Sequence, residues 1–356
     1  MATKVRNKNI DFLRFLFAFL IVMFHFRSFQ NIDFTANFLK GIKHCNICVE
    51  FFFIIAGYFL FQNINIKQDT FDFMKRRFFR LAPLIWVYIV LSAVFSSIFH
   101  FKFSYDGNIL QLFLLNNVGF SPLTGGTGCG VSWFVAVLFW TGVFYFYISK
   151  IFKTQYVNLI IWLITVCSLG IFLNNGSYGY GGHTSNIALV FNTGILRGLY
   201  GIGIGYFLSM IKDREFLEGY TSNLSECVFS ILELGLFGVI MYYSIFSDKV
   251  LGQSSFVIVF LFSIMFYLFI VKKGILSKLF DNNISAWLGQ SSYAIYVMHP
   301  LAGVVCDSIL KHNVHYVQAY PYYIYFAKVL IAIIFGIISF YIFEKPLNRL
   351  VKRFCN

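Results

Sequence analysis

The feature that most limits how this chain can fold is a series of long apolar stretches. A helix needs about 20 mostly apolar residues to cross roughly 30 Å of hydrocarbon. Ten stretches of this kind occur, centred near residues 18, 54, 91, 140, 165, 199, 237, 261, 298 and 333. Hydrophobic residues make up 58% of the 356 positions and charged residues only 12%, which excludes an ordinary soluble domain. We therefore predict an all-α, polytopic membrane protein with about ten transmembrane helices.

The positive charges predict how these helices are oriented. Lys and Arg concentrate in cytoplasmic loops, and an N-terminus on that side places 19 of the 28 cations in cytoplasmic segments and 6 outside. The other three, Arg14, Arg197 and Lys328, lie within or at the edge of spans. Both termini are therefore expected in the cytoplasm, and residues 1–356 are expected to form one transmembrane domain without an appended extracytoplasmic domain. The formal charge of +13 fits this sorting and contact with anionic membrane lipid better than nucleic-acid binding, because the cations form no single basic face.

The first span carries three residues that hydrocarbon disfavours, namely Asp11, Arg14 and His25. His25 lies eleven positions after Arg14, which on a helix is within about 20° of three full turns and a rise of about 16 Å. Asp11 joins the same face three residues before Arg14. Ionisable residues at bilayer depth usually face the bundle interior or a cavity, so this stripe is a candidate path between the two membrane sides. The structural alternative is that Arg14 pairs with Asp11 near the headgroups while His25 reaches the opposite interface.

Polar and small residues in the next two spans add further candidates. Glu50 opens the second span, where Ala56 and Gly57 permit the close approach of a helix or a substrate. The densest basic cluster follows, and it contains Lys75, Arg76, Arg77 and Arg80. Its arginine spacing suits phosphate groups, but positive-inside sorting alone also produces such a cluster. Pro83 is expected early in the third span, where proline is tolerated.

Two short motifs have structural interpretations. Cys45 and Cys48 form a C-x-x-C, which without a second pair at zinc spacing is more consistent with a packed or disulfide-capable pair than with structural zinc. We propose no metal site. Gly201 and Gly205 form a G-x-x-x-G in the glycine-rich sixth span, which predicts close helix packing.

The later spans carry the remaining candidates. Span order alone suggests that Glu233 neutralises Arg197. Polar residues follow one face of the ninth span, namely Ser292, Tyr293, Tyr296 and His299. Pro300 follows His299 and frees a carbonyl one turn back, so a hydrogen-bonded packing histidine is the alternative to a functional one. Glu344 begins a C-terminal tail in which proline is expected to stop the helix.

The chain resembles acyltransferase family 3, a family of membrane-embedded acyltransferases, over nearly its whole length. The family hallmark is an Arg and a His separated by ten residues in the first span, which reads R-FLFAFLIVMF-H here. Similar blocks are VEFFFIIAGYFL, RRFFRLAP with its Arg-x-x-Arg, LGQSSYAIYVMHPL and FEKPL. Two departures occur. Ala56 replaces the usual serine, and the segment GVSWFVAVLFW keeps Trp133 but lacks the glutamate that many relatives carry, since no acid lies between Asp106 and Asp213.

This resemblance implies that cytoplasmic acyl-CoA, most often acetyl-CoA, donates its acyl group to a hydroxyl of a surface or lipid-linked carbohydrate. No permanently bound cofactor is expected. The resemblance further implies proton transfer or acyl relay at His25, support from Arg14, and binding of the CoA phosphates by Arg77 and Arg80, with Arg76 beside them. An imidazole with a pKa near 6.5 suits the removal of a hydroxyl proton.

The remaining candidates complete the predicted site. Asp11 and Glu50 are the candidate acids, and Glu50 is the replacement considered for the missing glutamate. The residues expected to support the acceptor or the site are Trp133, Arg197, Tyr293 and His299. The expected location is the cytoplasmic membrane of a bacterium. A carrier or flippase for a lipid-linked sugar is the alternative from another class, although neither inverted repeats nor paired broken helices are found.

Overall fold

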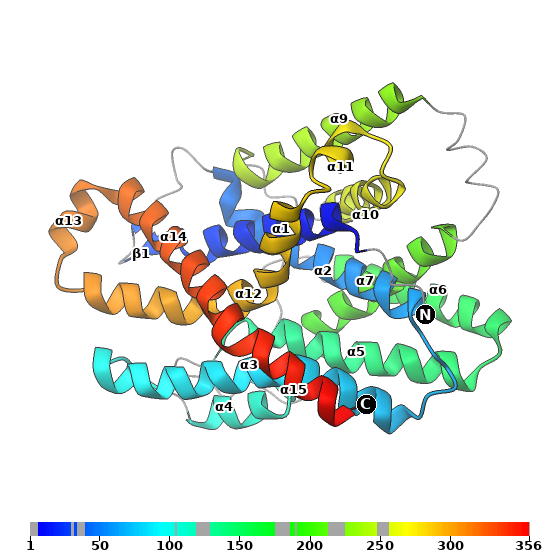
Figure 1. Cartoon of the computed structure of the whole chain (residues 1–356), viewed down its shortest axis with the longest axis horizontal. Coiled ribbons are helices and arrows are strands. Elements are labelled where there is room, and N and C mark those ends of the chain that lie inside the picture. The colour runs from blue at the N-terminus through cyan, green and yellow to red at the C-terminus, as the bar shows by residue number, and fades with distance from the viewer. Residues whose placement is uncertain are drawn as a thin grey trace.

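The computed structural model describes residues 6–29, 32–33, 40–103, 105–118, 129–174, 186–188, 191–212, 225–247 and 256–355. Its long elements are all helices, which confirms the all-α class (Figure 1). The helices are α1 (Lys8–His25), α2 (Cys48–Gln62), α3 (Thr70–Phe99), α4 (Tyr105–Leu112), α5 (Ser132–Ile151), α6 (Thr154–Asn174), α7 (Thr193–Lys212), α9 (Glu226–Ile245), α10 (Phe256–Val271), α11 (Ile275–Leu279), α12 (Asn283–Leu310), α13 (Val314–Ala319), α14 (Pro321–Ser339) and α15 (Lys345–Cys355). A 3-10 helix, η1 (Lys40–Ile47), precedes α2, and a π-helical turn, η4 (Phe340–Glu344), joins α14 to α15. Two short antiparallel hairpins pair β1 (Ser28–Phe29) with β2 (Ile32–Asp33), and β3 (Asn186–Ala188) with β4 (Phe191–Asn192).

Each of the ten predicted spans is centred within a helix of the structure. Eight helices in the described part of the chain are long and apolar enough to cross a membrane. The other two are α1, whose 18 residues include Lys8, Asp11 and Arg14, and α10, which has 16 described residues. The structure therefore supports a polytopic membrane protein, while the count of ten spans stays a prediction.

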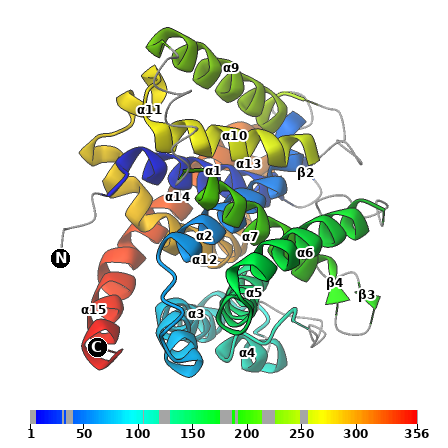
Figure 2. The same ribbon diagram turned by 90° about the vertical axis from the view of Figure 1, so that its right-hand side faces the viewer.

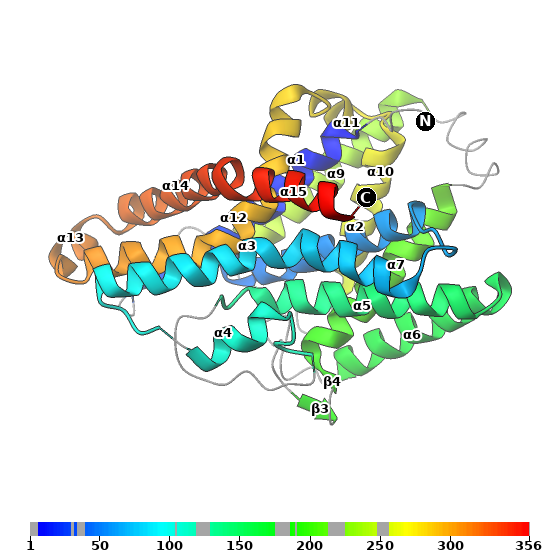
Figure 3. The same cartoon turned by 60° about the horizontal axis from the view of Figure 1, so that its bottom comes forward.

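The helix α1 lies near the centre of the bundle, beside α2, α10, α12 and α14 (Figure 2). Near the start of α1, the Lys8 ammonium donates a hydrogen bond to the Asn283 side chain at 2.8 Å, and near its end His25 meets His299. The helices α1 and α12 therefore run side by side in the same direction. The α2–α3 and α5–α6 turns lie at the end of the bundle that also carries both ends of the chain (Figure 3). This arrangement agrees with termini on one side of the membrane, and the cytoplasmic assignment of that side stays a prediction.

The glycines of α2 and α7 let these two helices pack in backbone contact. A Cβ atom added at Gly205 would collide with the backbone carbonyl of Ile54, and one at Gly57 would collide with the carbonyl of Ile202. Gly201 faces Phe53 in the same interface. The predicted role of Gly57, Gly201 and Gly205 in close helix packing is confirmed.

The prediction that proline stops the C-terminal helix is wrong, and Pro83, whose early place in the membrane span stays a prediction, lies inside a longer helix. The Asp69 carboxylate caps α3 by accepting hydrogen bonds from the backbone N–H groups of Phe71 and Asp72, so the helix starts at Thr70 and Pro83 lies in its interior. The hydrogen bond from Phe71 holds the pKa of Asp69 below its usual value. The C-terminal helix also continues past Pro346, because the preceding π-turn already interrupts the regular α-helical hydrogen bonds that proline would break.

Candidate active site in the helix bundle

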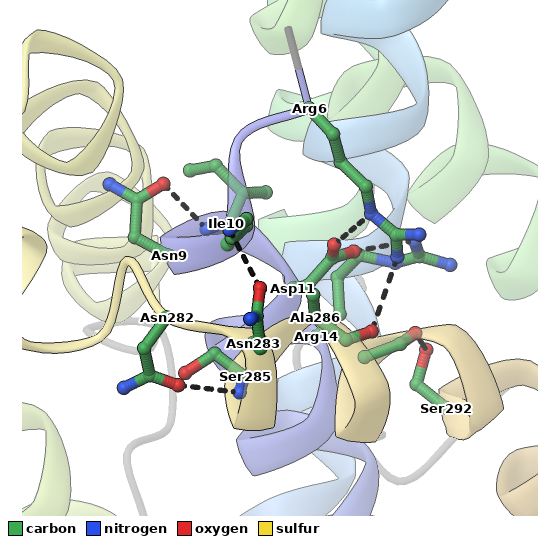
Figure 4. Close-up of polar contacts among 12 residues, drawn as sticks. Arg6, Asn9, Ile10, Asp11, Arg14, Asn282, Asn283, Ser285, Ala286 and Ser292 are labelled. Atoms are coloured by element: carbon green, nitrogen blue, oxygen red, sulfur yellow. Dashed lines mark hydrogen bonds and ion pairs between the residues drawn. The ribbon is translucent and has the colours of Figure 1, made fainter.

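The first half of the site is built where α1 crosses the start of α12. Gly289 of α12 packs directly against the backbone of Asp11, and a Cβ atom there would collide with it. Arg6 and Arg14 both pair with the buried Asp11 carboxylate, and the Arg14 contact measures 3.3 Å (Figure 4). Arg6 also donates a hydrogen bond to the backbone carbonyl of Ala286 at 3.4 Å. The pairing of Arg14 with Asp11 follows the structural alternative, but Arg14 has further neighbours.

Three more helices bring charged and polar groups to Arg14. Arg80 of α3 and Glu344 of the π-turn both lie within electrostatic range of its guanidinium, and Tyr293 of α12 interacts with the same two side chains. Asn348 hydrogen-bonds the Glu344 carboxylate, whose Oε2 atom is buried without a hydrogen-bond partner among the described residues. We call Arg14, Arg80 and Glu344 the charged cluster. The unused N–H groups of its arginines and the unused carboxylate oxygen of Glu344 are suited to a ligand that carries charge.

The three arginines predicted to bind the acyl donor have different surroundings in the structure, and their donor-binding role stays a prediction. Arg77 turns into the interface between α3 and α5, where it lies over Gly142 and donates a hydrogen bond to the backbone carbonyl of Leu138 at 3.1 Å. Arg80 belongs to the charged cluster, and Arg76 is exposed one turn before it in α3. Successive helical residues differ in direction by about 100°, which separates Arg76 from Arg77. Within this basic segment, Arg80 is the arginine that the structure brings to Arg14.

The second half of the site is a pair of histidines at the other end of α1. The ring centroids of His25 and His299 lie 4.9 Å apart. His25 is exposed and His299 is fully buried. Neither ring nitrogen of His299 has a hydrogen-bond partner of normal geometry among the described residues, although the backbone carbonyls of Ile295 and Tyr296 adjoin the ring. Pro300 frees the Tyr296 carbonyl, because proline has no N–H for the residue four positions earlier.

Arg197, Glu50 and Trp133 meet in the bundle interior. The Arg197 guanidinium pairs with the Glu50 carboxylate, donates a hydrogen bond to the backbone carbonyl of Asn46 at 3.2 Å, and lies 5.0 Å from the centre of the Trp133 ring. The suggestion that Glu233 neutralises Arg197 is therefore wrong. Glu233 instead accepts hydrogen bonds from the backbone N–H groups at the start of α11, at residues 276 and 277. Span order could not reveal which helices are neighbours.

Sequence reasoning missed a third intramembrane ion pair. Lys328 of α14 pairs with Asp307 of α12, and its ammonium lies 5.3 Å from the centre of the Phe26 ring, next to His25. The Lys328 side chain is 3% exposed and that of Asp307 is 42% exposed. The signal was present in the sequence, since an isolated cation in one span requires an acid in another. Each of the three cations assigned to spans, Arg14, Arg197 and Lys328, is thus paired with a carboxylate.

The remaining candidates make hydrogen bonds or packing contacts inside the bundle. The Tyr293 hydroxyl donates to the backbone carbonyl of Leu81 at 2.6 Å, so its proton is already engaged. The Cys45 and Cys48 thiols are both free and buried, and Cys45 donates to the Ser244 carbonyl. Among the described residues, no group of three or more His, Cys, Asp or Glu side chains is arranged to hold a metal ion.

Comparison with known proteins shows the family of this chain. The model of acyltransferase family 3, described as an acyltransferase domain, matches residues 7–345. The chain belongs to this family. A serine/alanine racemase from Enterococcus gallinarum is 25% identical over 122 residues, which cover 32% of this chain and only 17% of the racemase. No solved structure matches the chain.

Proposed function

We propose that this protein is an O-acyltransferase that moves an acyl group, most readily acetyl, from cytoplasmic acyl-CoA to a hydroxyl of a surface or lipid-linked carbohydrate. We place it in the cytoplasmic membrane of a bacterium. The observation that carries the proposal is the arrangement along α1, which has Arg14 in the charged cluster near one end and the His25–His299 pair near the other. About 16 Å of helix separates Arg14 from His25.

The charged cluster is the proposed binding site for the donor. Guanidinium groups form paired hydrogen bonds with phosphates, and Arg14 and Arg80 provide two guanidiniums from different helices. Arg14 donates one hydrogen bond, to Asp11, among the described residues, so it has N–H groups left for a ligand. The extended pantetheine arm of CoA can then carry the thioester along α1 toward His25. The donor is a co-substrate, and no permanently bound cofactor is proposed.

The reaction proposed at His25 is general-base catalysis. The acceptor hydroxyl gives its proton to the imidazole as its oxygen bonds to the thioester carbonyl carbon. The tetrahedral intermediate then collapses, the carbon–sulfur bond breaks, and the proton passes from His25 to the departing sulfur. The products are an O-acyl ester and CoA.

His299 is proposed to position His25. Its buried ring packs against the exposed ring of His25, so it limits the orientations that His25 can adopt. A base must be held within hydrogen-bond reach of the proton that it removes. The exposure of His25 agrees with access for a carbohydrate hydroxyl, which must reach the imidazole from outside the packed core.

The test is acyl transfer by membranes that contain the protein. Membranes are supplied with radiolabelled acetyl-CoA and a lipid-linked glycan, and label in the glycan is measured. We expect His25→Ala to reduce transfer about 100- to 10,000-fold, the usual effect of losing a general base. His315→Ala is the matched control, because His315 is exposed in α13 and outside the proposed site. Full activity of His25→Ala with normal membrane insertion would remove His25 from the reaction, and sugar transport without acyl-CoA would establish a carrier instead.

A further inference from the structure

An apolar groove runs along the outside of the bundle between α3 and α15. It has a volume of about 390 Å³, and its lining includes Phe79, Pro83 and Val90 of α3 together with Phe343 of the π-turn and Leu347 and Leu350 of α15. No charged side chain lines it. An apolar groove on a membrane-facing surface suits a hydrocarbon chain, because a polar occupant would lose its hydrogen bonds there.

The length of the groove matches one leaflet of a bilayer. Its lining on α3 extends from Phe79 to Leu91, which corresponds to about 18 Å of helix. Half of a hydrocarbon core of roughly 30 Å is about 15 Å. A single acyl chain of a phospholipid therefore fits along the groove from its headgroup end to the bilayer midplane.

Positively charged side chains lie at one end of this groove. Arg76 precedes Phe79 by three residues and Pro83 by seven, so it lies on the same face of α3. Arg353 follows Leu350 by three residues in α15, which runs opposite to α3 and ends at the same end of the bundle (Figure 3). Both arginines are exposed, as are Lys75 and Lys352, and Asp72 is the acid on this part of α3. The end of the groove is thus net positive.

We propose that the groove binds an anionic phospholipid, with one acyl chain along α3 and the phosphate between Arg76 and Arg353. The apolar lining accounts for the chain, and the positive end favours a headgroup with net negative charge over a zwitterionic one. The lipid fills the seam between α3, which carries Arg80, and the π-turn with α15, of which the π-turn carries Glu344. It therefore stabilises the contact that places these two side chains beside Arg14.

Native mass spectrometry of the purified full chain tests this proposal. The protein is incubated with phosphatidylglycerol or phosphatidylcholine, and lipid retention is measured at increasing collision energy. We expect one tightly held phosphatidylglycerol and at least fivefold weaker retention of phosphatidylcholine. Val90→Trp fills the groove and should reduce retention of phosphatidylglycerol at least tenfold. Val94→Trp is the matched control, because Val94 is an exposed valine one turn further along α3 that does not line the groove.

The headgroup contact has its own pair of variants. Arg76→Gln with Arg353→Gln should lower phosphatidylglycerol retention to the level of phosphatidylcholine, whereas Lys311→Gln, an exposed cation at the end of α12 and outside the groove, should leave it unchanged. Equal retention by Val90→Trp and Val94→Trp would overturn the chain site, and equal retention of the two lipids would overturn the anionic preference. Displacement of the lipid by palmitoyl-CoA but not by CoA would assign the groove to the acyl chain of a donor and overturn the phospholipid.

Discussion

Two ion pairs inside the helix bundle each join an arginine to a carboxylate, yet water reaches them to very different extents. In the Arg197–Glu50 pair, which connects α7 to α2, the side chains are 2% and 0% exposed. In the Arg14–Asp11 pair of α1, they are 31% and 6% exposed. The closed pair is completed by the Asn46 carbonyl and the Trp133 ring, whereas Arg14 keeps unused N–H groups and has Arg80 and Glu344 nearby.

This difference separates a structural role from a binding role. A buried, hydrogen-bonded pair is costly to break, because removing one partner leaves an uncompensated charge. An accessible arginine with unused donors can instead exchange water for a phosphate. We therefore expect Arg197 and Glu50 to control stability and Arg14 to control binding of the donor. The catalytic role predicted for Glu50 is tested by the same experiments.

The largest effect is expected from breaking the buried Arg197–Glu50 pair. Arg197→Met leaves the Glu50 carboxylate buried and unpaired, which should lower the free energy of unfolding by about 3–5 kcal/mol. Thermal unfolding of the purified protein in one detergent measures the loss. The double variant Glu50→Gln with Arg197→Met removes both charges and should recover most of the stability. A single variant as stable as the wild type would contradict the structural role.

The double variant also tests the predicted catalytic role of Glu50. If Glu50 acts only through its pair with Arg197, the folded double variant should keep most of its acyl-transfer activity. A stable double variant without activity would instead support Glu50 as the acid that replaces the missing glutamate. The readout is kcat for acetyl transfer in samples matched for folded protein.

A smaller effect, limited to the KM for the acyl donor, is expected from changing Arg14 in the accessible Arg14–Asp11 pair. Arg14→Lys keeps the charge but loses the planar fork that binds phosphate through two N–H groups. Loss of one or two charge-assisted hydrogen bonds should raise KM for acetyl-CoA about 10- to 100-fold. The unfolding temperature should change little, since Asp11 keeps Arg6 as a partner.

The matched substrate for this variant is a short acetyl thioester that lacks the nucleotide part of CoA. Its KM should be the same for Arg14→Lys and the wild type, because it carries no phosphate for Arg14 to bind. An equal rise in KM for both thioesters would mean that Arg14 acts at the reacting end of the donor instead.

Glu344 should have a smaller effect with the opposite sign. Its carboxylate makes no hydrogen bond to Arg14 or Arg80 among the described residues, so it affects them through its charge and does not fix their orientation. Glu344→Gln removes a negative charge that repels the donor phosphates, which should lower KM for acetyl-CoA about three- to tenfold. Glu226→Gln removes the same charge from an exposed pair with Lys278 and should leave KM unchanged. A higher KM in Glu344→Gln would show that the glutamate holds the arginines in place.

The positions of the helices were predictable because each span has to be apolar over its whole length. The close packing of α7 was also predictable, because Gly201 and Gly205 recur at a spacing of four, but its partner α2 was not. The partners of the charged residues were not, since span order does not say which helices touch. Arg197 was assigned to Glu233, and it pairs with Glu50.

Two features of the site were not predicted from the sequence, for different reasons. Projection onto a helix separates Arg76 from Arg77 by about 100°, but it places Arg80 within about 60° of each, so the contact of Arg80 with Arg14 could not be predicted without the fold. The inward position of Glu344 depends on the π-turn at Phe340–Glu344, for which the sequence gives no signal. The sequence therefore indicated the chemistry of each residue, whereas the identity of its neighbours in space could be obtained only from the structure.

The smallest effect is expected outside both pairs, at the cap of α3. Asp69→Ala removes the acceptor for the first backbone N–H groups of the helix that carries Arg80, and should lower the unfolding temperature slightly at pH 7. Because the folded state lowers the pKa of Asp69, the carboxylate stabilises the protein above its unfolded pKa and loses this effect as pH falls through the folded value. The difference in unfolding temperature between wild type and Asp69→Ala should thus be constant above about pH 5 and shrink below about pH 4.

Asp69→Asn keeps a capping oxygen without a titrating charge, so it should retain most of the stability and show no such pH dependence. An Asn variant as unstable as the Ala variant would mean that the charge near Lys150, rather than the cap, stabilises this end of α3.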